Sequence, residues 1–132
     1  MRDILFRGKR KDNGEWVEGY YNYATDGYNL ELHLISDKIT GIHTEVIPET
    51  VGQYTGLKDK NGKKIFEGDI VKISLYEIFR EQVIAIVAWD IRKAVFYLYG
   101  KTVITDFYHY FGDECEVIGN IYDNPIVSKK GR

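Results

Sequence analysis

The amino-acid sequence predicts a mainly β protein: a small, partly open β-barrel, SH3-like in part, with about seven or eight short strands and little helix. Two observations on composition favour this class. The 132 residues include 11 Tyr, 6 Phe and 2 Trp, and aromatic and β-branched side chains suit strands better than helices. The 13 glycines stand singly between apolar runs, as turns and bulges require. The third observation is length, because a short chain removes exposed strand edges most economically by curling its sheet.

The expected strands are short apolar runs separated by turn residues. They span 15–23, 28–35, 43–47, 70–75, 82–89, 94–99 and 116–122. In the second run Leu30, Leu32 and Leu34 alternate with polar residues, which predicts a strand with one solvated face. The run 82–89 is apolar on both faces, which predicts a central strand. The segment 102–111 is ambiguous between a strand and a short helix.

Turn residues delimit these runs. Residues 12–14, Asp-Asn-Gly, precede the first strand and are typical of a hairpin. Pro48 ends the third strand, because proline cannot donate to a strand ladder. The dipeptide at 61–62, Asn-Gly, predicts a two-residue type I′ turn. The dipeptide at 68–69, Gly-Asp, precedes an apolar strand, as at the entry into SH3-like barrels.

The length and the charge pattern indicate a single domain with basic ends. Domains commonly have about 100–150 residues, and no stretch has the composition of a linker, so we expect one domain over 1–132. Residues 1–11 hold five basic residues against Asp3, although the net charge of the chain is -2. Residues 127–132 hold three basic residues and no acid. We expect a basic N-terminal arm (1–11) and a flexible basic C-terminal tail (127–132).

The sequence favours the cytoplasm. No apolar run approaches the roughly 20 residues of a membrane helix, and the first 16 residues lack the apolar core of a secretory signal. Cys115 is the single cysteine, which excludes an internal disulfide and fits a reducing compartment. We therefore expect a cytoplasmic protein with no membrane partner.

Several segments together resemble the YopX-like family. They are 6–10 (FRGKR), 16–19 (WVEG), 48–59 (PETVGQYTGLKD), 61–71 (NGKKIFEGDIV) and 116–125 (EVIGNIYDNP). Residues 72–115 carry no motif that matches. The resemblance implies a β-rich fold and a protein encoded by a bacteriophage or prophage, which would work in the cytoplasm of a bacterial host. The family has no established activity, so the resemblance implies no catalytic residues.

Basic residues give one candidate site, for nucleic acid. Lysines crowd the expected turn after 56, and further cations lie in the N-terminal arm. The candidate residues are Lys58, Lys60, Lys63 and Lys64, with Arg7, Lys9 and Arg10. They would grip a phosphate backbone. The alternative is a solvated hairpin tip, in which Asp59 caps the turn and Asp69 accepts hydrogen bonds from backbone amides.

Aromatic residues give a second candidate site. They are Trp16, Tyr20, Tyr21, Tyr23 and Tyr54. A small core cannot bury the hydroxyl groups of so many tyrosines, so some should lie at a surface or at a subunit contact, where tyrosine is enriched. We expect a homo-oligomer interface; the alternative is a platform on which single-stranded nucleic acid stacks its bases.

Catalytic and metal chemistry have the weakest support. The candidate ligands Asp106, His109, Asp113 and Cys115 match no familiar zinc spacing. Acids on both sides of Cys115 disfavour its thiolate, and no nucleophile elbow, phosphate loop or dinucleotide fingerprint is present. We expect no metal, no cofactor and no enzyme. The sequence predicts a self-associating accessory protein that binds a phage or host protein; the alternative is a protein that binds single-stranded nucleic acid.

Overall fold

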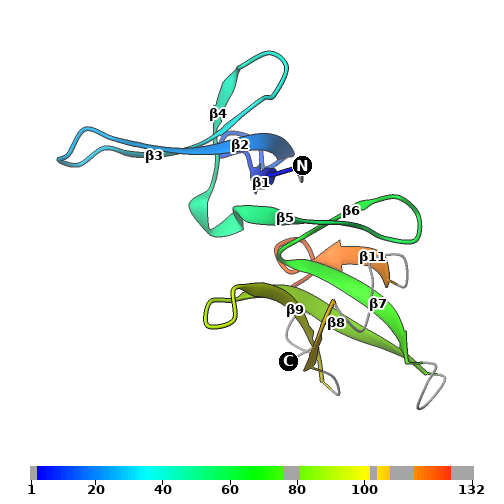
Figure 1. Cartoon of the computed structure of the whole chain (residues 1–132). Helices are drawn as coiled ribbons and strands as arrows, with labels where there is room; N and C mark the ends of the chain where they lie inside the picture. The colour runs from blue at the N-terminus through cyan, green and yellow to red at the C-terminus, as the bar shows by residue number, and fades with distance from the viewer. Residues whose placement is uncertain (1–2, 76–80, 102–103, 108–114, 126–132) are drawn as a thin grey trace. The chain divides into compact units, whose positions relative to one another are not determined.

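The computed structural model describes residues 3–75, 81–101, 104–107 and 115–125 (Figure 1). Its elements are β1 (Phe6–Lys9), β2 (Trp16–Thr25), β3 (Glu31–Ser36), β4 (His43–Glu45), a 3-10 turn η1 (Pro48–Thr50), β5 (Gly52–Lys58), β6 (Lys64–Phe66), β7 (Asp69–Leu75), β8 (Glu81–Asp90), β9 (Val95–Tyr99), β10 (Ile104–Asp106) and β11 (Cys115–Asn120). The predicted class, mainly β with little helix, is confirmed. The strands outnumber those expected. β1, β6 and β10 have only three or four residues, too few to show an alternating pattern, and the seven-residue β5 was missed by the sequence analysis.

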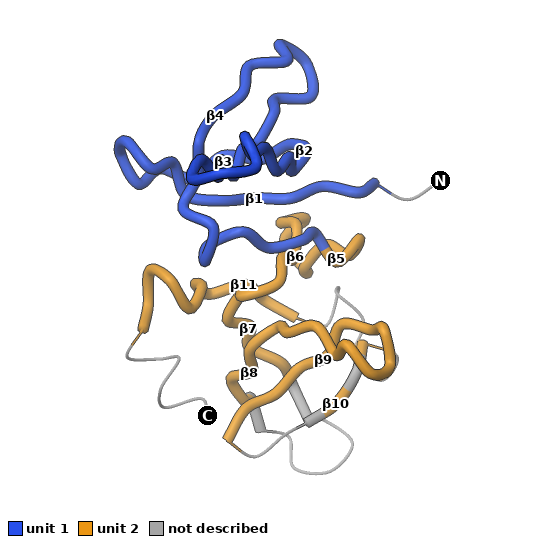
Figure 2. The backbone as a smooth tube through the Cα atoms, turned by 90° about the vertical axis from the view of Figure 1, so that its left-hand side faces the viewer, with its two compact units in different colours: residues 1–54 blue, residues 55–132 orange. Residues whose placement is uncertain are grey.

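The chain divides into two compact units, residues 1–54 and residues 55–132 (Figure 2). Unit 1 contains β1 to β4 and the first residues of β5, and unit 2 contains the remaining strands. The strands of both units pair antiparallel. Within the described ranges no sheet closes on itself, which agrees with the partly open architecture. The expectation of a single domain over 1–132 stays a prediction.

Unit 1 is built around a long hairpin of β2 and β3 (Figure 1). β3 also pairs with the short strand β4, and β2 pairs with β1. Its buried apolar side chains are Leu5, Ile35, Val46 and Tyr54. Gly19 lies on β2 against the carbonyl oxygen of Ser36, so a side chain at this position would collide with the backbone.

The burial of β3 differs from the sequence-based expectation. Leu32 and Leu34 are only half-buried, and Leu30 precedes the strand and is 49% exposed. Ile35, on the face that was expected to be polar, is 1% exposed. The pairing with β2 explains this difference, because Ile35 lies opposite Tyr21, whose ring is in contact with those of Phe6 and His33.

Unit 2 has its core on one face of the sheet β10-β9-β8-β7-β11. The fully buried members are Ile65, Val71, Ile73, Ala85, Val87, Leu98 and Cys115. The predicted alternation of β7 is confirmed where Val71 and Ile73 are buried and Lys72 between them is half-buried. The run 82–89 is the central strand that was predicted, since β8 lies between β7 and β9 and buries Ala85, Ile86 and Val87 in succession.

The C-terminal part of the sequence is described only in pieces. Residues 104–106 form a strand, which favours the strand interpretation of the ambiguous segment 102–111. Residues 102–103 and 108–111, and the expected basic tail 127–132, lie outside the described residues. The last strand ends at Asn120 and not at 122, because the side chain of Asn120 accepts hydrogen bonds from the amides of Tyr122 and Asp123 and so begins a turn.

Candidate interaction surface

The lysine-rich turn between β5 and β6 is held by the buried carboxylate of Asp59. Its Oδ1 accepts hydrogen bonds from the amides of Asn61 and Lys63, both at 2.9 Å, and its Oδ2 accepts one from the amide of Val117 on β11, also at 2.9 Å. Burial acts to raise the pKa of Asp59, but these three hydrogen bonds outweigh it and hold the pKa below its usual value. Gly62 has a φ of 82°, the left-handed conformation that the Asn-Gly turn requires.

The lysines of this turn differ in their surroundings. Lys58 and Lys63 are exposed, and Lys64 is half-buried. The Nζ of Lys60 lies 3.3 Å from a carboxylate oxygen of Glu116, and its backbone amide donates to the carbonyl of Cys115. The turn is thus attached to β11 by main-chain and side-chain contacts.

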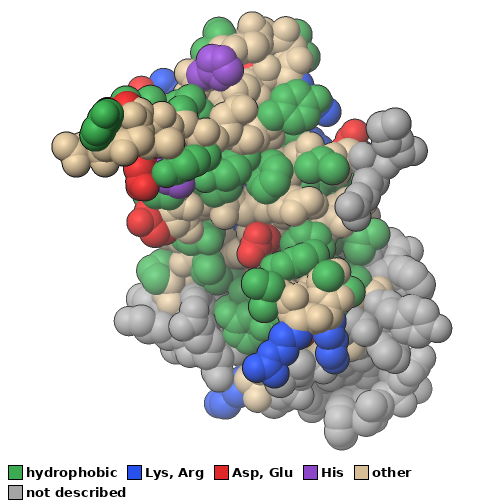
Figure 3. Space-filling view, turned by 60° about the vertical axis from the view of Figure 1, so that its left-hand side comes forward, with side chains coloured by type: hydrophobic (Ala, Val, Ile, Leu, Met, Phe, Trp, Pro, Cys, Tyr) green, Lys and Arg blue, Asp and Glu red, His purple; other side chains and the backbone are tan. Residues whose placement is uncertain are grey.

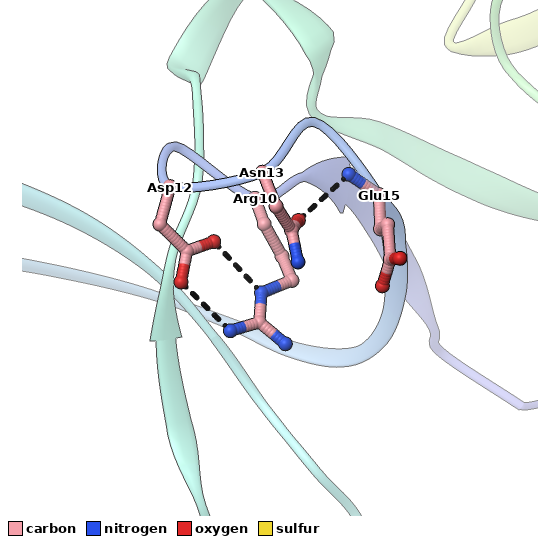
Figure 4. Close-up of polar contacts among 4 residues, drawn as sticks. All are labelled: Arg10, Asp12, Asn13 and Glu15. Atoms are coloured by element: carbon pink, nitrogen blue, oxygen red, sulfur yellow. Dashed lines mark hydrogen bonds and ion pairs between the residues drawn. The ribbon is translucent and has the colours of Figure 1, made fainter.

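The basic residues of the N-terminal segment are also engaged locally. Arg10 forms a two-pronged contact with Asp12, from Nε to Oδ1 at 2.9 Å and from Nη2 to Oδ2 at 2.8 Å (Figure 4). This hydrogen-bonded ion pair raises the pKa of Arg10 and lowers that of Asp12. In the same turn Asn13 accepts a hydrogen bond from the amide of Glu15. These contacts leave little of the charge of Arg10 for a ligand.

Two cations lie over the ring of Trp16 in unit 1. The guanidinium carbon of Arg7 lies 4.6 Å from the centre of the Trp16 ring, and the Nζ of Lys9 lies 5.5 Å from it. The strand register explains this cluster, because Lys9 lies opposite Trp16 and Arg7 follows on the same face. Arg7 is 8% exposed, so its guanidinium packs within the unit.

The five aromatic residues singled out in the sequence are not equivalent. Tyr20 and Tyr23 are about half exposed, at 51% and 52%. Trp16 and Tyr21 are half-buried, and Tyr54 is buried. Tyr21 is held between Phe6, at 5.7 Å between ring centres, and the stacked ring of His33, to which its hydroxyl is also hydrogen-bonded.

Three of the most exposed apolar residues of unit 1 were not singled out in the sequence analysis. Tyr28 is 90% exposed at the β2–β3 turn, and Ile39 and Ile42 are 96% and 64% exposed in the loop between β3 and β4. Figure 3 shows hydrophobic side chains at the surface of the hairpin and at its end. One signal was present in the sequence: large apolar residues stand among glycine and aspartate in segments that turn residues mark as loops.

The β2–β3 hairpin, residues 16–36, carries no positive charge; we call it the tyrosine arm. Its charged side chains are Glu18, Asp26 and Glu31. The sequence contains no lysine or arginine between Lys11 and Lys38. The exposed tyrosines therefore lie on an acidic element, and Tyr23 donates its hydroxyl hydrogen to Glu31 at 3.0 Å. A phosphate chain is negatively charged throughout and is repelled by such an element, whereas a protein surface can offer neutral or basic groups to it.

In the segments that resemble the YopX-like family, several polar residues and glycines shape turns, while other residues of these segments lie in strands such as β1, β2 and β5. Asp69 accepts a hydrogen bond from the amide of Phe66 at 2.7 Å. Gly68, at a φ of 91°, leaves room for the ring of Tyr122, which an added Cβ would meet at 3.0 Å. Asn124 accepts a hydrogen bond from the amide of Asn120 at 3.2 Å. These residues shape the backbone of the turns in which they lie.

Of the four candidate metal ligands, the structure describes Asp106 and Cys115. Among the residues that the structure describes, no three of His, Cys, Asp and Glu are grouped to hold a metal ion. Cys115 is fully buried in the core of unit 2, and Asp106 lies on β10. His109 and Asp113 lie outside the described residues. In the described parts of the chain, the structure has no helix with the length and apolar character needed to cross a membrane.

Comparison with known proteins shows the fold and the family. The crystal structure of protein EF1440 from Enterococcus faecalis is similar, with a TM-score of 0.55 and 24% sequence identity over 95% of this chain and 97% of that chain. At this identity the similarity shows the fold alone. No curated protein matches the sequence. The family model described as YopX protein matches residues 5–127, nearly the whole chain. This chain therefore belongs to the YopX protein family.

Proposed function

We propose that this protein is a non-enzymatic binding module that acts by contact with other proteins and associates with a second copy of itself through the tyrosine arm. The observation that carries the proposal is the exposure of Tyr20, Tyr23 and Tyr28, at 51%, 52% and 90%, on one hairpin. Tyrosine contributes a large apolar ring and a polar hydroxyl at a small entropic cost, which makes it a frequent interface residue. Exposed apolar groups that gather on one element are typical of contact surfaces.

The proposal about the biological setting is supported by the family. Membership in the YopX family supports an accessory protein that a phage or prophage encodes and that works in the cytoplasm of a bacterial host. The single, fully buried Cys115 suits such a reducing compartment. In that setting the tyrosine arm would contact a second copy of the chain or a phage or host protein.

Mass measurement tests the self-association. Light scattering on the full chain, from low micromolar to several hundred micromolar, should show a mass that rises above the monomer value of 15.4 kDa. A variant with Tyr20→Ser and Tyr23→Ser should shift this rise to higher concentration. The matched control is Ile91→Ser, which removes a side chain of unit 2 that is 85% exposed. A wild-type chain that stays monomeric throughout would overturn the proposal.

A second candidate function, binding of single-stranded nucleic acid, is favoured by the cations over Trp16. It is opposed by the ion pairs of Arg10 and Lys60 and by the acidity of the tyrosine arm. A gel-shift experiment with a labelled oligonucleotide at low salt tests it, with Lys9→Ala as the variant expected to weaken binding. Absence of a shift at micromolar protein would exclude this candidate.

A further inference from the structure

We infer that two copies associate as a two-fold dimer, in which the end of the tyrosine arm of one copy (residues 26–31) packs against the β3–β4 loop of the other (residues 37–42), and the reverse. The inference rests on the proposed self-association and names the surfaces that carry it. Both segments belong to unit 1 and flank the same strand, β3. We call them the arm tip and the β3–β4 loop.

The two segments expose more apolar surface than their position in turns explains. At the arm tip Tyr28 is 90% exposed and Leu30 is 49% exposed. In the β3–β4 loop Ile39 is 96% exposed and Ile42 is 64% exposed. Turn segments are usually polar, so four large apolar side chains in two turns indicate a surface that another molecule covers.

Both segments are fixed by hydrogen bonds before any contact forms. At the arm tip the Oδ1 of Asp26 accepts hydrogen bonds from the amides of Tyr28 and Leu30, at 2.8 and 3.0 Å. In the β3–β4 loop the Oδ1 of Asp37 accepts hydrogen bonds from the amide of Ile39, at 2.8 Å, and from that of Thr40. A pre-formed surface loses less conformational entropy on association, so exposed side chains on fixed turns suit a contact site.

The charges of the two segments are complementary. The arm tip carries Asp26 and Glu31 and no cation, whereas the β3–β4 loop carries Lys38. The carboxylates of Asp26 and Asp37 both accept hydrogen bonds from amides of their own turns, so the charge contact between copies is assigned to Glu31 and Lys38. Lys38 already lies over the ring of Tyr20, with its Nζ 5.9 Å from the ring centre. Lys38 therefore lies over β2 of the tyrosine arm, where the acidic arm tip of a second copy would meet it.

The geometry of β3 allows both contacts to form at once. The arm tip and the β3–β4 loop flank the opposite ends of this six-residue strand, which is roughly 20 Å long at the usual rise per residue. A two-fold axis near the middle of β3 places each tip on the loop of the other copy, which closes the assembly at two chains. Side-by-side pairing of two arms in the same direction would instead place acidic tip against acidic tip.

Charge reversal gives a test that does not depend on loss of structure. In sedimentation experiments on the full chain, Lys38→Glu alone should weaken the dimer about tenfold or more, and so should Glu31→Lys alone, because each places like charges at both contacts. An equimolar mixture of the two variants should recover the wild-type dissociation constant, since the heterodimer has opposite charges at both contacts. Ile39→Ser and Tyr28→Ser should also weaken the dimer, and Ile91→Ser should leave it unchanged.

The outcomes separate this inference from the proposed function. A wild-type chain that never dimerises would overturn both. A wild-type dimer that all four arm-tip and loop variants leave intact would keep the self-association and overturn the tip-to-loop contact. Failure of the mixture to recover the dimer, with each variant folded by circular dichroism, would also overturn that contact. Recovery in the mixture supports it, because folding defects in two separate chains do not compensate for each other.

Discussion

Asp59 accepts a hydrogen bond from the backbone amide of Val117 at 2.9 Å, although the two residues lie 58 positions apart in the chain. The other carboxylate oxygen of Asp59 holds the turn between β5 and β6. One buried side chain therefore fixes a lysine-rich turn and also attaches it to β11. The lysine-rich turn, which the sequence analysis named as a candidate phosphate-binding loop, therefore has a structural role in unit 2.

Replacement of Asp59 should destabilise the protein. In Asp59→Asn the amide nitrogen that replaces one carboxylate oxygen would face a backbone N–H, so a buried donor would lose its acceptor. The free energy of unfolding should fall by about 2–3 kcal/mol. Urea unfolding measures this loss. Asp12→Asn, at an exposed ion pair, is the control and should change stability by less than about 1 kcal/mol.

The effect of Asp59 should also depend on pH. Because hydrogen bonds hold its pKa below the usual value in the folded chain, the unfolded chain takes up the proton first as the pH falls. The stabilisation is therefore complete above the unfolded pKa, about 3.9, and is lost as the pH falls through the folded pKa. The stability difference between wild type and Asp59→Asn should be constant near neutral pH and shrink in acid. A difference independent of pH down to the acid limit would contradict this assignment.

Gly19 should tolerate no side chain. A Cβ at this position would collide with the carbonyl oxygen of Ser36, so in Gly19→Ala the β2–β3 pair must shift. We expect a loss of about 2–4 kcal/mol in thermal or urea unfolding. Gly41→Ala is the control for the loss of glycine's conformational freedom without a collision, since Gly41 has a φ of 72° and open space around it. It should cost only about 1 kcal/mol. Equal losses in the two variants would argue against the collision.

Periodic patterns and turn residues predicted most of the longer strands, because hydrophobic alternation and turn chemistry are local features of the sequence. The run 82–89 is β-branched and apolar on both faces, and it became the central strand β8. The Asn-Gly dipeptide at 61–62 became a turn with Gly62 in the left-handed conformation. In both cases the residues that decide the structure lie next to each other in the sequence.

The burial of individual side chains could not be predicted in the same way. Leu32 and Leu34 alternate regularly, yet Ile35 is the buried apolar residue of β3, because its cross-strand neighbour is Tyr21. Tyr54 and Tyr23 are the same residue type, yet Tyr54 is buried and Tyr23 is 52% exposed. Contacts between strands distant in the sequence decide such cases, and a single sequence does not contain them.

The hydrogen bonds of the turn at the arm tip should be lost only at a pH below the usual pKa of an aspartate. Hydrogen bonds from the amides of Tyr28 and Leu30 lower the pKa of Asp26. The charged carboxylate is the acceptor, so these contacts persist above that pKa and are lost as the pH falls through it. In a pH titration by NMR, the amide shifts of Tyr28 and Leu30 should move together with a midpoint below about 3.9. A midpoint above that value would contradict the contacts.

The hairpin turn between β8 and β9 should become more stable when Ala94 is replaced by glycine. Ala94 has a φ of 55°, a left-handed conformation that costs an L-residue roughly 1–2 kcal/mol. Glycine does not incur this cost but loses about 0.5–1 kcal/mol in backbone entropy. The free energy of unfolding of Ala94→Gly, measured in urea, should therefore rise by about 0.5–1 kcal/mol. Ala24→Gly is the control, because Ala24 is also exposed but lies in β2, where glycine should destabilise by about that amount. A loss of stability in both variants would show that the conformation of Ala94 is not strained.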